Sequence, residues 1–373
     1  MMQNILTASE NYTELDKYFR SSGAGTILLV CDGSIGFLKL NEYFDTLENR
    51  LGIKVIRFSG FEPNPRYESV VKGVEVFRRG GCQLISAVGG GSAMDVAKCI
   101  KLYSNMDDGY NYLKQEIVPN DIPLLAVPTT AGTGSEATRY AVIYYNGEKQ
   151  SVTHESCIPE TVLFDASVLK TLPVYQKKAT MMDAFCHAAE SFWSVNSTEE
   201  SKKFSRDAIK LILANMDGYI SNDEAANANM LRAANLAGKA INITQTTAGH
   251  AMCYKLTSLY GIAHGHAAAL CVRVLFPYMY KNPDKCTDPR GAGYLGEAFA
   301  EIASAMGCED AGAAGERFGE IVQKLGLEAP VTDTPDSDIE LLTGSVNPVR
   351  MKNNPVALDN ETIEMLYRRI LGV

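Results

Sequence analysis

The first half of the chain alternates short apolar runs with amphipathic stretches, and this alternation constrains the fold more than any other feature. The apolar runs have the length of buried strands and lie at residues 26–31 (TILLVC), 54–58 (KVIRF), 84–88 (LISAV) and 124–127 (LLAV). Apolar residues at helical spacing occupy residues 67–79 and 93–103 between them. Strands that alternate with helices predict an open parallel sheet covered by helices on both faces.

The pattern changes after residue 172, where strand runs become scarce and the chain becomes Ala-rich with helical periodicity. The clearest predicted helices there are residues 179–194, 199–215, 225–239 and 294–306. A chain of 373 residues also exceeds the roughly 250–300 residues at which a single core stops growing. We therefore expect two domains, an α/β domain at residues 1–172 and an all-helical domain at residues 173–373.

Composition narrows the class of protein. A hydrophobic content of 46% and a charged content of 21% exclude disordered and fibrous chains. A net charge of −9 disfavours nucleic acid and anionic membranes as partners. The nine cysteines form no CxxC pair, which predicts reduced thiols in a cytoplasmic protein. The N-terminal stretch is polar and no run reaches ~20 apolar residues, so we expect neither a signal peptide nor a transmembrane helix.

Two loops rich in small and hydroxyl-bearing residues follow neighbouring predicted strands. The first, residues 89–92 (GGGS), leads into a helix whose N-terminus can bind a pyrophosphate, although a plain strand-to-helix turn is the alternative. The second covers residues 129–136 (TTAGTGSE). Such loops at the carboxyl ends of parallel strands predict a ligand-binding crevice. Asp32 ends the first strand, where it either binds a ribose 2′-hydroxyl and favours NAD over NADP, or is a turn residue.

Four of the five histidines lie in the predicted helical domain. Asp183 and His187 are four residues apart and share one helix face, which suits either two ligands of one ion or a simple helix pair. His250 and His264 follow, each beside a glycine. Together the four residues predict a metal site whose carboxylate and imidazole ligands suit Fe²⁺ or Zn²⁺ rather than Ca²⁺ or Mg²⁺. His154, in the first domain, is predicted to be structural.

In these motifs the chain resembles the iron-containing (group III) alcohol dehydrogenases. The matching segments follow the family's order over nearly the full length: Pro63-Asn64-Pro65, GGGSAMDVAK, PTTAGTGSEAT, the Asp183/His187 helix and the segment from His250 to Gly265. The resemblance implies a Rossmann-like N-terminal domain, a helical metal-binding C-terminal domain of the dehydroquinate synthase-like architecture, a metal between them and a homodimer. Carried over by position, the metal ligands fall on Asp183, His187, His250 and His264. The contacts to NAD(H), with NADP(H) as the alternative, fall on Asp32, Asn64, Gly90, Gly91, Ser92, Asp95, Thr129, Thr130, Thr133, Val142 and Lys149.

The sequence departs from the family at the positions expected to move the proton. Many members carry a further histidine four residues after the third ligand, where this chain has Tyr254. The proline that usually precedes the last ligand is Ala263, and an extra histidine, His266, follows that ligand. Tyr254 and His266 are therefore the candidate residues for proton transfer, with water as the alternative.

The expected substrate side of the site is unusually polar. Members that act on simple alcohols have apolar residues there, whereas this chain has Arg139, Tyr140, Thr246, Thr247 and Lys255. Two cations in a net-acidic protein suggest a small anionic substrate, although ordinary surface ion pairs are the alternative. The stretches QTTAGHAMCYKLTSLYGIAHGHAAAL and NPVRMKNNPVALD are similar to the branch described as phosphonoacetaldehyde reductases.

These features predict a metal-dependent enzyme that reduces a small anionic aldehyde, such as phosphonoacetaldehyde to 2-hydroxyethylphosphonate, with hydride from a nicotinamide and a metal as Lewis acid. The alternatives are an alcohol dehydrogenase of simple alcohols or semialdehydes, a metal- and NAD-dependent cyclase of the dehydroquinate synthase type, and a non-catalytic nucleotide-binding protein. The cyclases typically use a glutamate where this chain has Asp183. A buried ligand set without a metal would be costly to keep, which disfavours the non-catalytic alternative.

Overall fold

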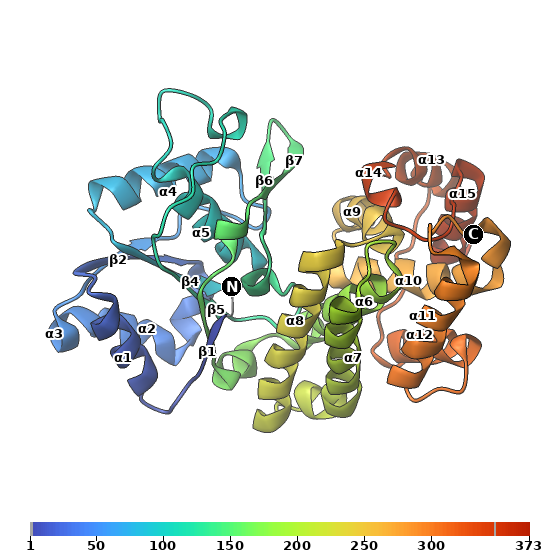
Figure 1. Cartoon of the computed structure of the whole chain (residues 1–373), viewed down its shortest axis with the longest axis horizontal. Coiled ribbons are helices and arrows are strands. Elements are labelled where there is room, and N and C mark those ends of the chain that lie inside the picture. Colours follow the sequence, from blue (N-terminus) through green and yellow to red (C-terminus); the bar gives the residue numbers. More distant parts are fainter. Residues whose placement is uncertain (1–2, 347) are drawn as a thin grey trace. The chain divides into compact units, whose positions relative to one another are not determined.

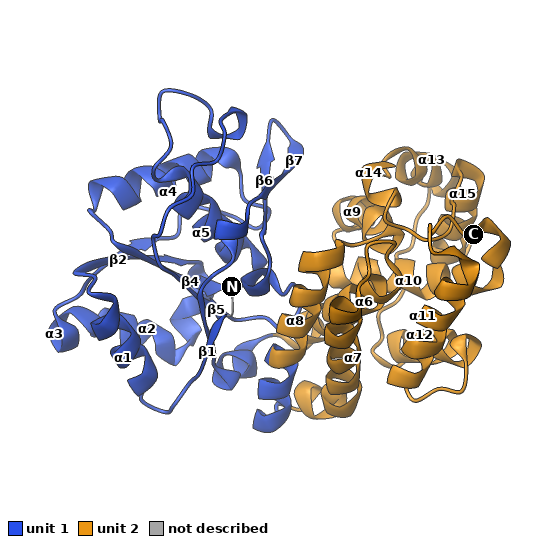
Figure 2. Ribbon diagram, viewed as in Figure 1, with its two compact units in different colours: residues 1–172, 222–231 blue, residues 173–221, 232–373 orange. Residues whose placement is uncertain are grey.

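The structure is a computed structural model that describes residues 3–346 and 348–373. Its chain forms two compact units, coloured separately in Figure 2. Unit 1 comprises Met1–Leu172 and Asn222–Leu231, and unit 2 comprises Pro173–Ser221 and Arg232–Val373. Residues 222–231 thus belong to unit 1, whereas the sequence placed them with the second half, and the domain boundary at 172/173 remains a prediction. Among the described residues, no helix is both long and apolar enough to cross a membrane.

Unit 1 is built on a six-stranded sheet in which every strand pair is parallel, with the order β1-β8-β5-β4-β2-β3. The strands are β1 (Asn4–Thr7), β2 (Thr26–Cys31), β3 (Lys54–Phe58), β4 (Leu84–Gly89), β5 (Leu124–Pro128) and β8 (Thr161–Phe164). The central strands β4 and β5 are buried along their whole length, as expected of a parallel sheet covered on both faces. The predicted parallel sheet is therefore confirmed.

Helices cover both faces of this sheet, with α4 and α5 on one face and α1 and α2 on the other (Figure 1). The helices are α1 (Thr13–Ser22), α2 (Lys39–Asp45), α3 (Leu47–Leu51), α4 (Tyr67–Arg79) and α5 (Gly91–Tyr103). Short 3-10 turns lie at η1 (Gly33–Phe37), η2 (Tyr112–Lys114), η3 (Ser135–Ala137), η4 (Glu155–Cys157) and η5 (Ala166–Thr171).

The unit also contains an antiparallel hairpin of β6 (Tyr140–Tyr145) and β7 (Glu148–Thr153). Asn146 and Gly147 form its turn with positive φ angles of 53° and 78°, the conformation that Asn-Gly turns favour.

Unit 2 contains only helices as regular elements within the described residues, as predicted. Its longer helices are α6 (Val174–Trp193), α7 (Glu199–Ile220), α8 (Glu224–Thr244, which begins in the part of the chain assigned to unit 1), α9 (Ala248–Tyr260) and α10 (His264–Lys281). The remaining elements are η6 (Pro283–Lys285), α11 (Gly291–Ala305), α12 (Ala311–Lys324), α13 (Pro335–Gly344), α14 (Pro348–Met351) and α15 (Asn360–Leu371).

Helix α6 is the centre of unit 2. It packs against α7, α10 and α11, and all of its side chains from Met181 to Trp193 are buried. A helix that is buried all round must satisfy any polar side chain it carries within the protein. Asp183, His187 and Glu190 are such side chains, so their partners identify a polar site inside the helical unit.

Candidate metal centre and nucleotide-binding loops

The two loops singled out in the sequence lie against each other at the carboxyl edge of the sheet in unit 1. The strand register pairs Gly89 with Pro128, so the loops that follow β4 and β5 leave the sheet side by side. A Cβ atom added at Gly91 would lie 3.2 Å from Thr133 Cγ2, and one at Gly90 would lie 3.4 Å from Thr130. The small residues therefore let the backbone at the start of α5 approach the second loop closely.

Asp32 and Asn64 lie on other loops of unit 1. The Asp32 Oδ1 atom accepts a hydrogen bond from the Ser34 amide at 2.8 Å, which is the turn contact considered from the sequence. Its Oδ2 atom lies 3.7 Å from the Cβ position of Gly89, so the carboxylate also borders the glycine-rich loop. Asn64 is exposed and has a left-handed φ of 58° just before α4.

A buried lysine that the sequence reading missed fastens the second loop. Lys98 on α5 is fully buried, and its Nζ atom donates to the Ser135 carbonyl at 2.5 Å, to Ser135 Oγ at 2.9 Å and to the Tyr140 carbonyl at 2.8 Å. Ser135 Oγ in turn donates to Asp95 at 2.9 Å. Burial raises the pKa of Asp95, although the Lys98 charge and a hydrogen bond from the Val142 amide oppose the increase.

The predicted ligands Asp183, His187, His250 and His264 all lie in unit 2, where they come together. The Oδ1 atom of Asp183 is 3.4 Å from Nε2 of His250, 3.9 Å from Nε2 of His264 and 4.0 Å from Nε2 of His187. In Asp183, His187 and His250, the potential ligand atoms all lie within 4.8 Å of one another. The His264 side chain is 37% exposed, whereas the other three are almost completely buried, so the site is open beside His264.

Glu190 holds His250 in place, and the sequence reading did not identify it. One carboxylate oxygen of Glu190 contacts Nδ1 of His250, and the other accepts hydrogen bonds from the Thr247 amide at 2.9 Å, the Thr247 hydroxyl at 2.6 Å and the His250 amide at 3.2 Å. A carboxylate at Nδ1 places the imidazole proton there and leaves Nε2 free to bind a metal.

The electrostatics of the cluster fit a cation. Burial disfavours the charge on His250, but Glu190 and Asp183 outweigh it and raise the pKa of His250 to about 10. Burial likewise opposes ionisation of the two carboxyl groups, yet the imidazoles hold the pKa of Asp183 and that of Glu190 below their usual values. One carboxylate and three imidazoles that converge through Oδ1 and Nε2 atoms form a donor set that suits Fe²⁺ or Zn²⁺.

Two glycines let the other helices approach α6 at this site. A Cβ atom at Gly265, beside His264, would lie 2.0 Å from the Ala179 carbonyl oxygen and 2.6 Å from Asp183 Cβ. A Cβ atom at Gly249, beside His250, would lie 3.1 Å from the Glu190 carboxylate. The space at Gly265 is closed by the backbone of α6, and that at Gly249 by the side chains of Glu190 and, at 2.8 Å, Val272.

The two candidate proton-transfer residues have different surroundings. The Tyr254 ring stacks on the His264 imidazole, with centroids 5.5 Å apart and planes at 16°. His266 is buried, and its ring nitrogens contact the Tyr175 hydroxyl at 3.1 Å and the Glu328 carbonyl at 2.9 Å. Both nitrogens of His266 are thus used in contacts with the fold, whereas Tyr254 borders a proposed ligand.

The predicted substrate residues are divided between the units. Arg139 and Tyr140 belong to unit 1, where the Arg139 guanidinium pairs with Glu155 at 2.6 Å. Thr246 and Lys255 belong to unit 2, with Thr246 buried and Lys255 half-buried on α9. The remaining cofactor candidates, Ser92, Thr129 and Lys149, lie in unit 1.

Two further features lie outside these groups. His154 precedes η4, where its Nδ1 atom accepts a hydrogen bond from the Ser156 amide at 3.1 Å, in keeping with a structural role.

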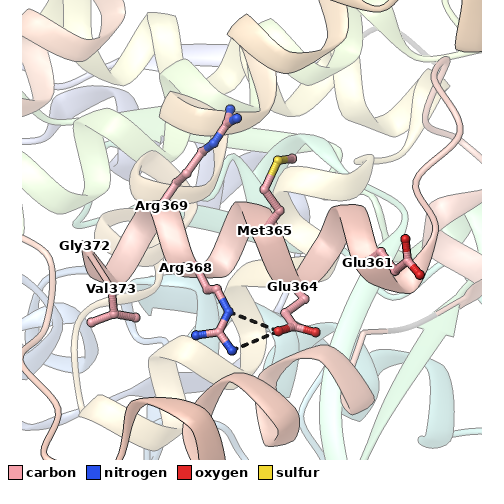
Figure 3. Close-up of a pocket in the computed structure, with 7 residues that line it drawn as sticks. All are labelled: Glu361, Glu364, Met365, Arg368, Arg369, Gly372 and Val373. Atoms are coloured by element: carbon pink, nitrogen blue, oxygen red, sulfur yellow. Dashed lines mark hydrogen bonds and ion pairs between the residues drawn. The ribbon is translucent and has the colours of Figure 1, made fainter.

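A surface pocket runs along α15, and none of the predicted site residues lines it (Figure 3). There Arg368 pairs with Glu364 at 2.9 Å.

Comparison with known proteins gives consistent matches over both halves of the chain. The family model "Iron-containing alcohol dehydrogenase" matches residues 3–166, and the model "Fe-containing alcohol dehydrogenase family, C-terminal" matches residues 177–371. The 1,3-propanediol dehydrogenase of Citrobacter freundii is 34% identical over 294 residues, which cover 76% of this chain and 73% of that protein.

Two similar proteins are named for aldehydes that carry an acidic group. The phosphonoacetaldehyde reductase of Streptomyces viridochromogenes is 33% identical over 235 residues, which cover 59% of this chain and 60% of that protein. The crystal structure of sulfoacetaldehyde reductase from Bifidobacterium kashiwanohense, in complex with NAD⁺, has a TM-score of 0.87 and 25% identity, and the match covers 100% of this chain and 97% of that one.

Proposed function

Because the chain belongs to the iron-containing alcohol dehydrogenase family, we propose that it reduces a small anionic aldehyde, such as phosphonoacetaldehyde, with NADH. The enzyme class follows from the family, whose members are NAD-linked alcohol dehydrogenases and aldehyde reductases with a bound metal. The anionic substrate is the finer part of the proposal. It is supported by the similarity to reductases of a phosphonate and a sulfonate aldehyde.

The observation that carries the proposal is the convergence of the Asp183 carboxylate with three imidazole Nε2 atoms in unit 2. We propose Asp183, His187, His250 and His264 as the ligands of Fe²⁺ or Zn²⁺. When bound, the metal supplies a Lewis acid for the carbonyl oxygen, and the nicotinamide supplies the hydride. Glu190 keeps the His250 proton on Nδ1, and the open side at His264 gives the substrate access.

We propose that the loops after β2, β4 and β5 bind the dinucleotide in unit 1. The N-terminus of α5, which Thr130 and Thr133 border, is proposed to bind the pyrophosphate through the amides of its first turn. Asp32 is proposed to accept a hydrogen bond from the ribose, which would favour NAD over NADP. The Lys98 ammonium holds the second loop against α5 and so fixes the width of the phosphate site.

Tyr254 is the better candidate of the two for proton transfer. Its ring lies on the His264 imidazole at the open side of the site. His266 already contacts Tyr175 and Glu328 through both of its ring nitrogens. Replacement of Tyr254 by Phe is therefore expected to lower kcat, whereas replacement of His266 acts through packing.

The substrate class is tested by NADH oxidation with the metal-loaded enzyme. Phosphonoacetaldehyde, lactaldehyde, succinic semialdehyde and propanal are compared at equal concentrations. We expect the highest kcat/KM for phosphonoacetaldehyde, and we expect Arg139→Ala to raise KM for that substrate far more than for propanal. A higher kcat/KM for propanal than for every anionic aldehyde would refute the anionic substrate class.

The alternative is a dehydrogenase of simple alcohols, favoured by the 34% identity to a 1,3-propanediol dehydrogenase. In that case 1,3-propanediol and propanal would be the best substrates, and Arg139 would serve only its ion pair with Glu155. The ligand assignment is tested separately from the substrate. Asp183→Ala and His264→Ala should lose metal and turnover together, and a variant that keeps both would remove that residue from the ligand set.

A further inference from the structure

A short helix near the C-terminal end of the chain places an arginine beside a predicted substrate residue. Arg350, on α14, donates from Nη1 to the Thr246 hydroxyl at 3.4 Å. The segment that follows is fastened to the same loop, because the Asn353 amide donates to the Thr246 carbonyl and to Gln245 Oε1, both at 3.1 Å. Arg350 is therefore fixed against the loop that precedes α9, although it is more than a hundred residues away in sequence.

This loop is directly connected to the proposed metal centre. The residue after Thr246 is Thr247, whose amide and hydroxyl both donate to Glu190, at 2.9 and 2.6 Å. Glu190 also contacts Nδ1 of His250. The Arg350 guanidinium thus lies one residue away from the group of contacts that orients a proposed ligand.

The same loop leads into α9 (Ala248–Tyr260), which carries both His250 and Tyr254. The Tyr254 ring stacks on His264, whose side chain is the accessible one of the four proposed ligands. The hydrogen bond to Thr246 therefore places the Arg350 guanidinium beside the start of the helix that borders this side of the metal centre.

Within the described part of the chain, no acidic side chain neutralises the charge of Arg350. Among the described residues no carboxylate forms an ion pair with Arg350, whereas Arg139 pairs with Glu155 and Arg290 pairs with Asp288. The neutral Thr246 hydroxyl uses only part of the donor capacity of a guanidinium, which has five N–H groups in a planar fork. A half-buried guanidinium with donors to spare is suited to a phosphonate, sulfonate or carboxylate.

We propose that Arg350 binds the acidic group of the substrate and thereby sets the preference for anionic aldehydes. This inference rests on the proposed function and names the residue of unit 2 that recognises the anion.

The test compares Arg350→Ala and Arg350→Lys with Lys352→Ala, which removes an exposed cation from the same segment. For each variant, kcat/KM is measured with phosphonoacetaldehyde and with propanal, and KM is measured for NADH. Loss of charge-assisted hydrogen bonds should lower kcat/KM for phosphonoacetaldehyde by about 10- to 100-fold in Arg350→Ala. In Arg350→Ala, kcat/KM for propanal and KM for NADH should change less than about twofold, and in Lys352→Ala all three parameters should do so. Arg350→Lys should recover part of the lost kcat/KM for phosphonoacetaldehyde, because lysine restores the charge without the planar fork.

Binding of the product provides a readout that does not depend on turnover. Titration calorimetry with 2-hydroxyethylphosphonate should show a weaker dissociation constant in Arg350→Ala by a similar factor. Circular dichroism and thermal unfolding establish that the variants are folded, and if Arg350→Ala is not, Arg350→Lys decides the question by its smaller loss.

The possible failures are distinguishable. A wild-type enzyme that prefers phosphonoacetaldehyde, with a preference that persists in Arg350→Ala, overturns the role of Arg350 and leaves the proposed function standing. Equal losses for both aldehydes, or a raised KM for NADH alone, also overturn it, because they assign Arg350 to the fold or to the cofactor. A wild-type enzyme without a preference for anionic aldehydes refutes both the proposed substrate class and this inference.

Discussion

Glu190 offers the sharpest test of the proposed metal centre, because it is not itself a proposed ligand. In Glu190→Gln the new side chain has nearly the same shape, and its Oε1 can still accept from Thr247 at the distances of 2.9 and 2.6 Å seen for Glu190. Its NH₂ group, however, faces Nδ1 of His250, where the carboxylate lies now. Two donors then oppose each other unless the imidazole proton moves to Nε2, the atom that points at Asp183.

The size of the effect follows from this change of tautomer. To bind a metal, His250 must release the proton from Nε2 and return one to Nδ1, where it no longer finds a carboxylate. The loss of a hydrogen bond to a charged group costs about 1.5–3 kcal/mol. That range corresponds to a metal affinity about 10- to 100-fold weaker, which agrees with the effects of similar second-sphere substitutions.

The assay is competition for Zn²⁺ and Fe²⁺ between the protein and a chelator of known affinity. Asp288→Asn is the matched control, since Asp288 is also a buried carboxylate of unit 2 but pairs with Arg290 instead of a proposed ligand. The control is expected to lower stability and leave metal affinity unchanged. If folded Glu190→Gln binds both metals within twofold of the wild type, the proposed role of Glu190 is wrong.

Three further predictions concern packing, pH and the metal. Gly265→Ala should destabilise the protein by about 1–3 kcal/mol in urea unfolding and weaken metal retention, because the added methyl group meets Ala179. The control Gly293→Ala should be neutral or stabilising, because its methyl group would meet nothing within 4 Å. Equal destabilisation by both substitutions would contradict the packing argument. Burial lowers the pKa of Lys177 from 10.5 to about 8. Between pH 8 and 10.5 the unfolded state therefore binds more protons than the folded state, and the free energy of unfolding should rise with pH by up to about 3 kcal/mol. Lys177→Met should abolish this rise, and a variant with the pH profile of the wild type would show that Lys177 is not its cause. Chelation should lower the melting temperature, reflecting about 2.7 kcal/mol lost at a metal concentration of 100 Kd, and re-addition of Zn²⁺ should restore it; no change would argue against a bound metal.

Periodicity was sufficient to predict the main elements of both units, but it failed for short ones. The buried strands β4 and β5 and the long helix α6 gave clear signals because apolar residues continue along them. Strands β1 and β8 have only four residues each, too few for a period to be recognised. The hairpin of β6 and β7 could have been found, since Asn146-Gly147 directly after the strand-like run YAVIYY is a strong turn signal.

The site residues that lie close together in the sequence could be predicted, whereas those that only the fold brings together could not. Asp183 and His187 stand one helical turn apart, so their shared face is visible in the sequence. Glu190 lies on the same helix, but its role is to contact His250, which is sixty residues away in the sequence. A charged residue within the apolar stretch HAAESFW was the only available signal. Arg350 was likewise hidden, because only the fold brings it to Thr246.

The spacing of the proposed ligands depends on how closely the helices of unit 2 approach one another. The ligands Asp183 and His187, and Glu190 behind them, occupy one face of α6 at positions i, i+4 and i+7. The other two proposed ligands, His250 and His264, come from α9 and α10. Each of those helices meets α6 at a glycine next to its histidine: Gly265 lies against Asp183 and Gly249 against Glu190. A methyl group at Gly265 would meet the backbone of α6 and push α10 away together with its imidazole, whereas one at Gly249 would displace the side chains of Val272 and Glu190. Variants that keep all four ligands but alter these glycines should therefore lose metal affinity, because the distances between the ligand atoms depend on the helix contacts.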